Sequence, residues 1–396
     1  MSRTVVIASG VRTAIGDFGG SLAGISPCDL AASVAREAIA RAGIAPSDVG
    51  QTVFGHVIHT APEDMYISRV AAIRAGVPET SPALTLNRLC GSGLQAIVTA
   101  AEQILLGNAD ITLAGGAESM SRAGHLLTQA RHGQKMGDTL ALDMMTGALT
   151  DPFGNGHMGI TAENISQRAG IDRAAQDAFA LESHKRAAHA IAEGRFVDQI
   201  LPLTVKQGRK EFVFDTDEHV RADVSLADLA KLRPAFRKDG TVTAGNASGI
   251  NDAGAAVVLM EEGVAAARGF VPLGRIIAYG LGGVAPEVMG LGPVPAVKQA
   301  LQRAGLAVSD IDVIESNEAF AVQACAVSAE LGFAPEKVNP NGGAIALGHP
   351  VGASGAIILI KALYELKRTD GRYGLATMCI GGGQGIAVII ENPAHG

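Results

Sequence analysis

The sequence predicts an α/β enzyme made of two similar halves, and three observations lead to this prediction. The chain has 396 residues, which suits two or three domains or one duplicated fold. Apolar residues make up 47% of it and charged residues 18%, so a large hydrophobic core can form. A stretch near the N-terminus, residues 38–49, returns as residues 300–311 with seven identical positions, at an offset of 262 residues.

The repeat extends over whole structural units. At the same offset, residues 92–93 correspond to residues 354–355, Ser-Gly in both cases, and an apolar helical stretch follows each pair. Gly-rich apolar strands are expected near the end of each half, at residues 111–116 and 375–382. Each half has the order strand, amphipathic helix, strand, Gly loop, helix and strand, which is typical of parallel sheets covered by helices. The alternative is a coincidence in an Ala- and Gly-rich chain. Two matching segments at the same offset, with no insertion or deletion between them, disfavour it.

The domain boundaries follow from this repeat. We expect the N-terminal half at residues 1–120 and the C-terminal half at residues 272–396. Residues 121–244 have no counterpart in the repeat and are richer in polar residues and His. A run of apolar residues at 255–260 is typical of a buried strand, so the N-terminal half should resume over about 245–271.

Charge and composition exclude several classes of protein. The formal net charge is −7, whereas a nucleic-acid-binding chain needs a basic face. No apolar run approaches the roughly 18 residues that span a membrane. Strand-like apolar sequence begins at residue 5 and the last four residues match no organelle signal, so a cytoplasmic location is expected. The four cysteines are too few and too far apart for a disulfide scaffold or a CxxC metal site.

The first candidate loop covers residues 87–93, Asn-Arg-Leu-Cys-Gly-Ser-Gly, just before an apolar helix. Backbone N–H groups and the helix dipole at such a turn favour an anion, so we expect a thiol pKa below about 8.5 at Cys90 and a nucleophilic role. A buried structural cysteine is the alternative, as most cysteines are. Residues 91–96 also fit the dinucleotide pattern GxGxxA, although that fingerprint belongs to the first strand–helix turn of its unit.

The second candidate loop, residues 339–350, holds His349 between a glycine and a proline. The repeat offset places this loop just before the helix that mirrors the one after Cys90. Equivalent loops of two halves packed about a pseudo-twofold axis can converge on one cleft, which would bring a thiol and an imidazole base together. A structural histidine is the alternative.

Two further stretches offer polar side chains or bare backbone. Cys379 precedes the glycine run 381–383, whose N–H groups can donate to an oxyanion or can simply form a hairpin between the last two strands. Asn317 follows a strand and can either cap the next helix or hold a water or an oxyanion. Cys325 lies within that helix and is expected in the core.

Together these loops resemble the active-site blocks of the thiolase family, the acetyl-CoA C-acyltransferases. The likeness runs from Thr4 to about Ile390 and rests on four blocks in family order: residues 87–93, 317–320, 348–350 and 379–385. Supporting blocks are residues 156–159, 231–234, 245–249 and 288–290. The pattern is most similar to bacterial β-ketothiolases of the acetoacetyl-CoA and polyhydroxyalkanoate type.

The resemblance implies a thiolase fold. Two βαβαβαββ-type halves would pack about a pseudo-twofold axis into five α-β-α-β-α layers, and residues 121–244 would form an inserted loop domain over CoA. It also implies an activity: condensation of two acetyl-CoA to acetoacetyl-CoA and CoA, or thiolysis of short 3-ketoacyl-CoA, by ping-pong chemistry. No metal and no redox cofactor is implied.

The resemblance also implies roles for the residues of the candidate loops. Cys90 would carry the acyl group, His349 would be its base, and Cys379 would remove or return the α-proton of the second acyl-CoA. His349 and a water held by Asn317 would form one oxyanion hole, and the backbone N–H groups of Cys90 and Gly381 the other.

Further residues match family positions along the path of CoA and its pantetheine arm. They are Leu149, His157, Met158, Arg221, Phe236, Ala247, Ser248, Ala319 and Phe320, with Met289 near the acyl group. Acyl-CoA and CoA are therefore the expected partners, without nucleic acid or membrane. Family members are commonly homotetramers, so a homotetramer is expected here.

Three departures from the family pattern stand out. Arg88 stands in place of a Gln, Ser316 in place of an Ala, and residues 59–66 in place of a Gly/Gln/Asn-rich loop. None of them removes a catalytic group. Loop 59–66 can shape the rim of a neighbouring active site and so affect the preferred acyl chain length.

Three other functions compete with this one. A decarboxylating ketoacyl synthase shares the fold but lacks a second catalytic cysteine, so the intact Cys379 block disfavours it. A non-catalytic acyl-CoA-binding relative typically loses the nucleophile, the base or the second cysteine, and all three are present here. A dehydrogenase built on residues 91–96 is the weakest alternative.

Overall fold

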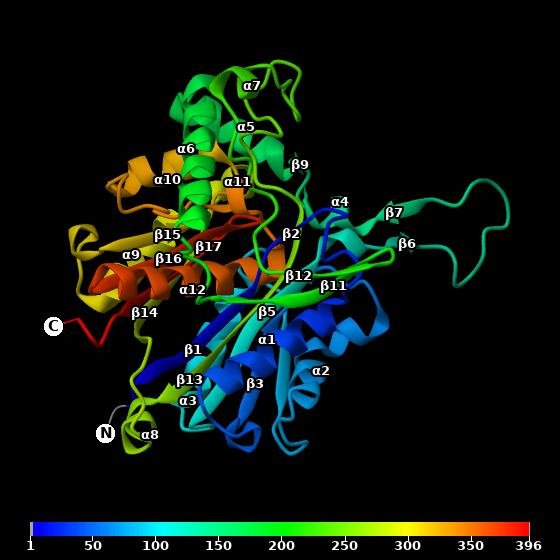
Figure 1. Cartoon of the computed structure of the whole chain (residues 1–396). Coiled ribbons are helices and arrows are strands. Elements are labelled where there is room, and N and C mark those ends of the chain that lie inside the picture. Colours follow the sequence, from blue (N-terminus) through cyan, green and yellow to red (C-terminus); the bar gives the residue numbers. More distant parts are fainter. Residues whose placement is uncertain (1–2, 396) are drawn as a thin grey trace.

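A mixed sheet of eleven strands runs through the part of the chain that the structure describes, residues 3–395 (Figure 1). The structure is a computed structural model. The N-terminal half contributes β1 (Val5–Thr13), β2 (Gly16–Asp17), β3 (Gln51–Gly55), β4 (Ala83–Leu86), β5 (Ile111–Ser119), β10 (Ile200–Leu201) and β13 (Asn251–Glu261). The C-terminal half contributes β14 (Gly274–Gly283), β15 (Val313–Ser316), β16 (Tyr373–Ile380) and β17 (Gln384–Glu391). The main strand order is β15-β16-β17-β14-β1-β13-β5-β3-β4, with β10 on β1 and β2 on β13.

The two halves share one strand arrangement. In the first half, β3 is parallel to β4 and β5, and β13 is antiparallel to both β5 and β1. In the second half, β15 is parallel to β16, and β17 is antiparallel to both β16 and β14. Val338 makes a parallel bridge to Ile314 at the place that β4 has in the first half. Since β3 and β15 start 262 residues apart, as do β5 and β16, the repeat in the sequence is a repeat in the structure.

The expectation of parallel sheets is wrong for one strand in each half, because β13 and β17 run antiparallel to both of their neighbours. The strand β17 follows β16 after only the glycines at 381–383, and so short a connection can join only antiparallel strands. The strand β13 takes the same place in the first half after a much longer excursion of the chain.

Helices and sheet alternate in five layers. The helices α1 (Pro27–Arg41) and α2 (Ile67–Arg74) cover the first half, α9 (Pro293–Ala304) and α10 (Ala321–Leu331) cover the second, and α3 (Ser92–Leu105) and α12 (Val351–Thr369) lie between them. A Cβ atom at Gly355 would lie 2.3 Å from the Leu94 backbone nitrogen, and one at Gly93 would lie 2.8 Å from that of Ala356. The middle helices can therefore touch only because both copies of the repeated Ser-Gly pair carry glycine.

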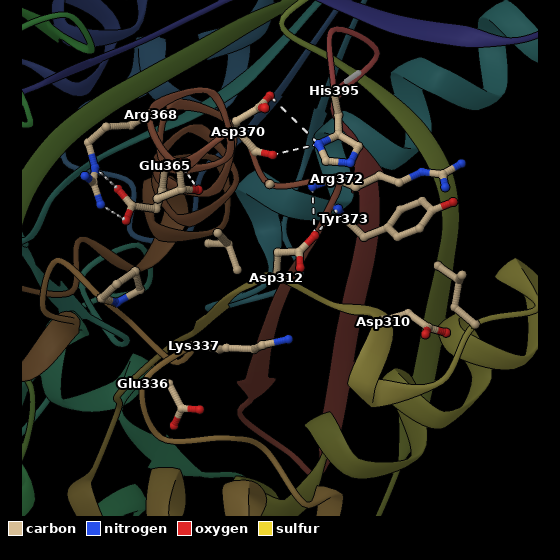
Figure 2. Close-up of a pocket in the computed structure, with 15 residues that line it drawn as sticks. Asp310, Asp312, Glu336, Lys337, Glu365, Arg368, Asp370, Arg372, Tyr373 and His395 are labelled. Atoms are coloured by element: carbon tan, nitrogen blue, oxygen red, sulfur yellow. Dashed lines mark hydrogen bonds and ion pairs between the residues drawn. The ribbon is translucent and has the colours of Figure 1, made fainter.

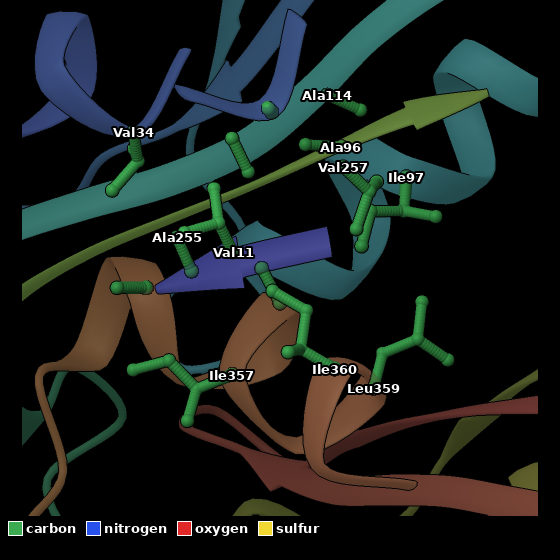
Figure 3. Close-up of a cluster of buried hydrophobic side chains, with 14 of the residues drawn as sticks. Val11, Val34, Ala96, Ile97, Ala114, Ala255, Val257, Ile357, Leu359 and Ile360 are labelled. Carbon is green, nitrogen blue, oxygen red and sulfur yellow. The ribbon is translucent and has the colours of Figure 1, made fainter. Parts of the chain in front are cut away.

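The hydrophobic core lies where these layers meet. Val11 of β1 and Val257 of β13 are fully buried, and they belong to one cluster with Val34 of α1, Ile97 of α3 and Ile360 of α12 (Figure 3). This cluster joins the two halves, so the sheet and the middle helices form one rigid base for the loops at the strand ends.

The chain between β5 and β13 folds mostly outside the sheet. It contains β6 (His125–Leu127), β7 (Ala141–Asp143), α4 (Met144–Ala148), β8 (Thr150–Asp151), β9 (Gly156–His157), α5 (Met158–Ala169), α6 (Arg173–Ala192), β11 (Leu203–Gln207), β12 (Lys210–Phe214) and α7 (Leu226–Ala230). Two short helices lie elsewhere, α8 (Glu262–Ala267) and α11 (Ala344–Leu347). The β6–β7 hairpin projects far from the body of the molecule (Figure 1). The exact domain boundaries stay a prediction.

Candidate active site

Cys90 lies in a strained turn between β4 and α3. The residue before it, Leu89, has a φ of +46°, a left-handed conformation that costs a non-glycine residue about 1–3 kcal/mol. Ser92 stabilises the turn, because its hydroxyl donates to the Leu89 carbonyl at 2.7 Å and accepts from the Arg88 N–H at 2.8 Å. The thiol is thus fixed at the N-terminal end of α3, and it is only 9% exposed.

Burial dominates the chemistry of this thiol. It raises the pKa of Cys90 to about 11, although the backbone N–H groups of Gly381 and Cys90 hydrogen-bond the sulfur and lower the pKa. The nearby Glu118 carboxylate raises it further. The expected pKa below 8.5 is therefore wrong, because the favourable dipoles act on a sulfur that has lost its contact with water. Cys90 consequently needs a base to take its proton.

His349 has the properties of such a base. Burial lowers its pKa to about 4, so the imidazole is neutral at pH 7. Its Nδ1 lies 2.6 Å from Ser354 Oγ, and the Ser354 hydroxyl donates to the Pro350 carbonyl at 2.9 Å. A hydroxyl has one proton, so Nδ1 must be the donor to Ser354 and Nε2 carries the free lone pair. Nε2 is buried and has no hydrogen-bond partner among residues 3–395.

The loops of Cys90 and His349 meet because their helices cross at their first turns. A Cβ at Gly93, three residues after Cys90, would lie 3.0 Å from the carbonyl oxygen of Gly352, three residues after His349. A hydrogen bond also connects the two halves here: the carboxylate of Glu118, at the end of β5, accepts from the Gly352 N–H at 2.9 Å. The two halves therefore supply the thiol and the imidazole to one place.

Cys379 lies near the end of β16, opposite Gly385 of β17. Burial raises its pKa, and the proximity of Cys90 raises it further, so the two thiols lie close together. The glycines that follow form the β16–β17 hairpin, and Gly381 also directs its N–H at Cys90. The hairpin considered for this glycine run is thus present, and donation to an oxyanion stays a prediction. A Cβ at Gly381 would lie 2.1 Å from Met158 Cε, so a side chain there would require the Met158 side chain to move.

Asn317 is buried at the end of β15. Its backbone N–H donates to the Thr377 carbonyl at 3.0 Å, and its side-chain Nδ2 has no partner in the described part of the chain. The following helix, α10, begins at Ala321 and has no side-chain cap, so Asn317 is not its cap. A buried amide without a protein partner is available to a water or an oxyanion.

Cys325 is less buried than expected. It is only half-buried in α10, where it lines a pocket of about 410 Å³ together with Phe179, Ser183 and Phe333. Neither Cys90 nor Cys379 lines this pocket.

Most of the residues expected along the CoA path belong to one apolar cluster with Cys379. Met158, Phe236, Ala247, Met289, Ala319 and Phe320 are the members among them. The His157 ring stacks on Phe236 at a centroid distance of 4.7 Å, and Phe236 meets Phe320 edge-on at 6.2 Å.

Three other residues predicted along the CoA path lie outside this apolar cluster. The Ser248 N–H donates to the Ala319 carbonyl at 3.0 Å, and the Leu149 carbonyl accepts from the Met158 N–H at 2.8 Å. Arg221 is not a member of the cluster: its side chain is exposed, and its backbone N–H donates to His184 Nδ1 at 3.2 Å. The place of Arg221 along the CoA path stays a prediction.

Comparison with known proteins identifies the family. The model of the thiolase N-terminal domain matches residues 5–263, and that of the thiolase C-terminal domain matches residues 270–392. The chain belongs to the thiolase family. It is 62% identical to beta-ketothiolase BktB of Cupriavidus necator, over 99% of this chain and 100% of the relative. It is 51% identical to an acetyl-CoA acetyltransferase of Chromobacterium violaceum, over 98% and 100% of the two chains. A crystal structure of human mitochondrial 3-ketoacyl-CoA thiolase in complex with CoA aligns with a TM-score of 0.96 and 42% identity, over 99% and 98% of the two chains.

These matches confirm the predicted family, fold class and acyltransferase activity, and they support the catalytic function over the non-catalytic alternative. The dinucleotide interpretation of residues 91–96 also loses its basis in this thiolase. A Cβ at Gly91 would lie 2.4 Å from Ile380 Cδ1, and Gly93 abuts α12, so these glycines serve packing and leave no open backbone for a pyrophosphate.

Sequence reasoning missed several buried polar residues around the thiolase site. Glu118 accepts from the N–H groups of Val57 and Ile58, and its Oε1 lies 3.3 Å from His56 Nδ1. Ser354 fixes the His349 tautomer, but in the sequence it stands out only because it corresponds to Ser92 in the repeat. That equivalence was the available signal, because Ser92 likewise holds the turn of a catalytic loop.

A large open pocket elsewhere does not belong to this site. It measures about 830 Å³ and lies at the starts of β15 and β16 (Figure 2). Two pairs of its charged side chains bind each other: Arg368 pairs with Glu365, and His395 Nδ1 lies 3.8 Å from Asp370. Within residues 3–395, no three His, Cys, Asp or Glu side chains are grouped in a way that could hold a metal ion. None of the helices described has the length and apolar character needed to cross a bilayer.

Proposed function

We propose that this thiolase catalyses the reversible condensation of two acetyl-CoA to acetoacetyl-CoA and CoA, and the thiolysis of short 3-ketoacyl-CoA. One observation carries the proposal: two buried thiols lie close together beside the Gly381 N–H, in reach of a loop that holds a neutral imidazole with a free Nε2. The names of its relatives, a beta-ketothiolase and an acetyl-CoA acetyltransferase, support the same activity.

In the first half-reaction, His349 Nε2 takes the proton of Cys90. The Cys90 thiolate attacks the thioester carbon of acetyl-CoA, and the oxyanion is stabilised by the N–H groups of Cys90 and Gly381, which already point at the sulfur. The C–S bond to CoA then breaks, and the CoA thiolate takes the proton from His349. The products are acetyl-Cys90 and CoA, with the imidazole neutral again.

In the second half-reaction, Cys379 loses its proton to His349 and removes the α-proton of a second acetyl-CoA. The enolate oxygen is stabilised by the protonated His349 and by a water on Asn317 Nδ2, whose free N–H groups suit that role. The carbanion attacks acetyl-Cys90, the C–S bond breaks, and Cys90 takes the proton back from His349. Protons and electrons balance without a metal or a redox cofactor.

The apolar cluster supports a path for the pantetheine arm. Met158, Phe236, Ala319 and Phe320 offer a narrow apolar wall next to Cys379, which suits an uncharged chain that ends in a thioester. Met289 is buried in the same cluster and is proposed to contact the acyl group. Arg221 is proposed to attract the CoA phosphates.

A homotetramer is proposed as the assembly. The projecting β6–β7 hairpin exposes Leu126, Leu127 and Leu142, which are 48%, 48% and 41% exposed, and an exposed apolar arm suits contact with another subunit. Met65 and Tyr66, directly before α2, are also exposed and offer a second apolar contact surface. A cytoplasmic role in fatty acid metabolism or polyhydroxyalkanoate synthesis is proposed from the resemblance alone.

Isotope exchange tests the proposed reaction. Labelled CoA should exchange into acetyl-CoA without any net condensation, because this exchange needs only the first half-reaction. Cys90→Ala should abolish both exchange and condensation. Cys379→Ala should keep the exchange and lose the condensation. If both variants keep both activities, the assignment is overturned.

A further inference from the structure

A small buried cavity lies beside the candidate active site. It measures about 20 Å³, more than the roughly 10–15 Å³ that one water needs, and every residue that lines it is buried. Four of its polar lining side chains are Glu315, Asn317, Ser354 and Lys361. A polar cavity of this size holds water when at least two polar groups face it.

Two of these side chains form an ion pair that is almost completely buried. Lys361 Nζ of α12 lies 2.7 Å from Glu315 Oε2 of β15, and it also donates to the Gly342 carbonyl at 2.6 Å. Burial raises the pKa of Glu315 to about 7, against the stabilising effect of Lys361. The second carboxylate oxygen, Oε1, has no hydrogen-bond partner among the residues that the structure describes. A buried carboxylate oxygen without a partner is costly, so a water in the adjoining cavity is the natural donor to it.

The ion pair is connected to the site from two sides. Glu315 lies two residues before Asn317, whose Nδ2 also has no partner within the protein. Lys361 holds Gly342, in the loop that leads to His349. Ser354, which accepts from His349 Nδ1, lines the same cavity. One water can accept from Asn317 Nδ2 and donate to Glu315 Oε1, which satisfies both unpartnered groups.

We propose that Glu315 and Lys361 are positioning residues for the thiolase reaction, which act through one buried water on the Asn317 amide and through the surrounding loop on the Ser354–His349 pair. The inference rests on the proposed function, since it concerns the residues assigned to the enolate oxyanion hole. Neither Glu315 nor Lys361 touches the substrate. They fix the orientation of Asn317 and His349, which are proposed to act on the substrate.

Single variants with a matched control test this role. Glu315→Gln and Lys361→Met should each lower kcat roughly 10- to 100-fold, because misdirected catalytic groups lose rate steeply, with KM for acetoacetyl-CoA changed less than about twofold. Glu391→Gln removes the carboxylate of another ion pair, the one with Arg275 at the far end of β17 from Gly385 and outside the cavity, and should leave kcat within about twofold. If kcat of the folded Glu315 and Lys361 variants stays within twofold of the native value, the positioning role is refuted.

A double variant keeps the test valid if a single variant fails to fold. Glu315→Leu combined with Lys361→Met replaces the ion pair by apolar groups, which often preserves or raises stability. This protein should fold and still show the reduced kcat, because the acceptor for the water is gone. Native kcat in the folded double variant would contradict the inference.

Two further readouts separate this inference from the proposed function. A crystal structure of the native protein should contain a water within hydrogen-bond distance of both Glu315 Oε1 and Asn317 Nδ2, and absence of that water from well-ordered density would overturn the proposal. Native protein that shows no CoA exchange would instead refute the proposed function. Normal exchange in native protein together with unaffected variants would refute only the positioning role.

Discussion

His349 Nδ1 lies 2.6 Å from Ser354 Oγ, and the single hydroxyl proton of Ser354 goes to the Pro350 carbonyl. This chain of two hydrogen bonds fixes which imidazole nitrogen holds the proton. The helix α12 that carries Ser354 is packed against α3 of the other half, so the group that fixes the tautomer lies beside the contact between the halves.

Ser354→Ala should lower kcat about tenfold or more, because Nδ1 loses its acceptor and the imidazole no longer keeps Nε2 free in a fixed direction. Steady-state thiolysis of acetoacetyl-CoA measures this. Ser354→Thr keeps a hydroxyl and serves as the control, with most of the activity retained. Equal activity of the alanine and threonine variants would show that the hydroxyl does not matter.

The acid limb of the pH–rate profile for acylation should lie at an unusually low pH. Acylation of Cys90 needs neutral His349, whose pKa burial lowers to about 4. The rate of Cys90 acetylation in a single turnover should therefore stay level down to about pH 5 and fall only below it. A midpoint near 6.5, the value of an ordinary imidazole, would contradict the buried and neutral state of His349.

The same burial makes stability depend on pH. Both His349 and His184 have pKa values of about 4 in the folded chain, below the 6.5 of an unfolded histidine. Between these values the unfolded chain binds more protons, so stability is present above about pH 6.5 and is lost as the pH falls toward 4. Thermal unfolding at pH 7 and pH 5 measures this, and His184→Asn should reduce the difference between the two melting temperatures.

The crossing of α3 and α12 should tolerate no side chain at its closest point. Gly355→Ala would place a methyl group 2.3 Å from a backbone atom of Leu94, so it should destabilise the fold by about 3 kcal/mol or more. Gly24→Ala is the control, because a Cβ at Gly24 meets nothing within 4 Å. Denaturant unfolding compares the two. Similar stability of both variants would show that the helices can separate without cost.

The β6–β7 hairpin should be required for assembly and not for chemistry. Replacing both Leu126 and Leu142 by Asp puts charges on the exposed apolar arm, so the proposed tetramer should dissociate into smaller species. Light scattering after size exclusion measures the mass. A tetramer that survives the double substitution would exclude the hairpin as an assembly contact.

Much of this molecule could be predicted from the sequence because the signals are local. The repeated Ser-Gly pair marks the helix crossing, and the turns around Cys90, His349 and Cys379 are short motifs with fixed chemistry. The pKa of Cys90 could not be predicted, since burial depends on what packs over the thiol. The antiparallel places of β13 and β17 depend on how distant strands pair, and the ion pair of Glu315 with Lys361 joins residues that no sequence pattern connects.

The mass of the intact protein after brief exposure to acetyl-CoA tests the central claim most directly. Native protein should gain one acetyl group per chain, Cys379→Ala should gain it as well, and Cys90→Ala should gain none. Acetylation that persists in the Cys90→Ala variant would contradict the assignment of Cys90 as the residue that carries the acyl group.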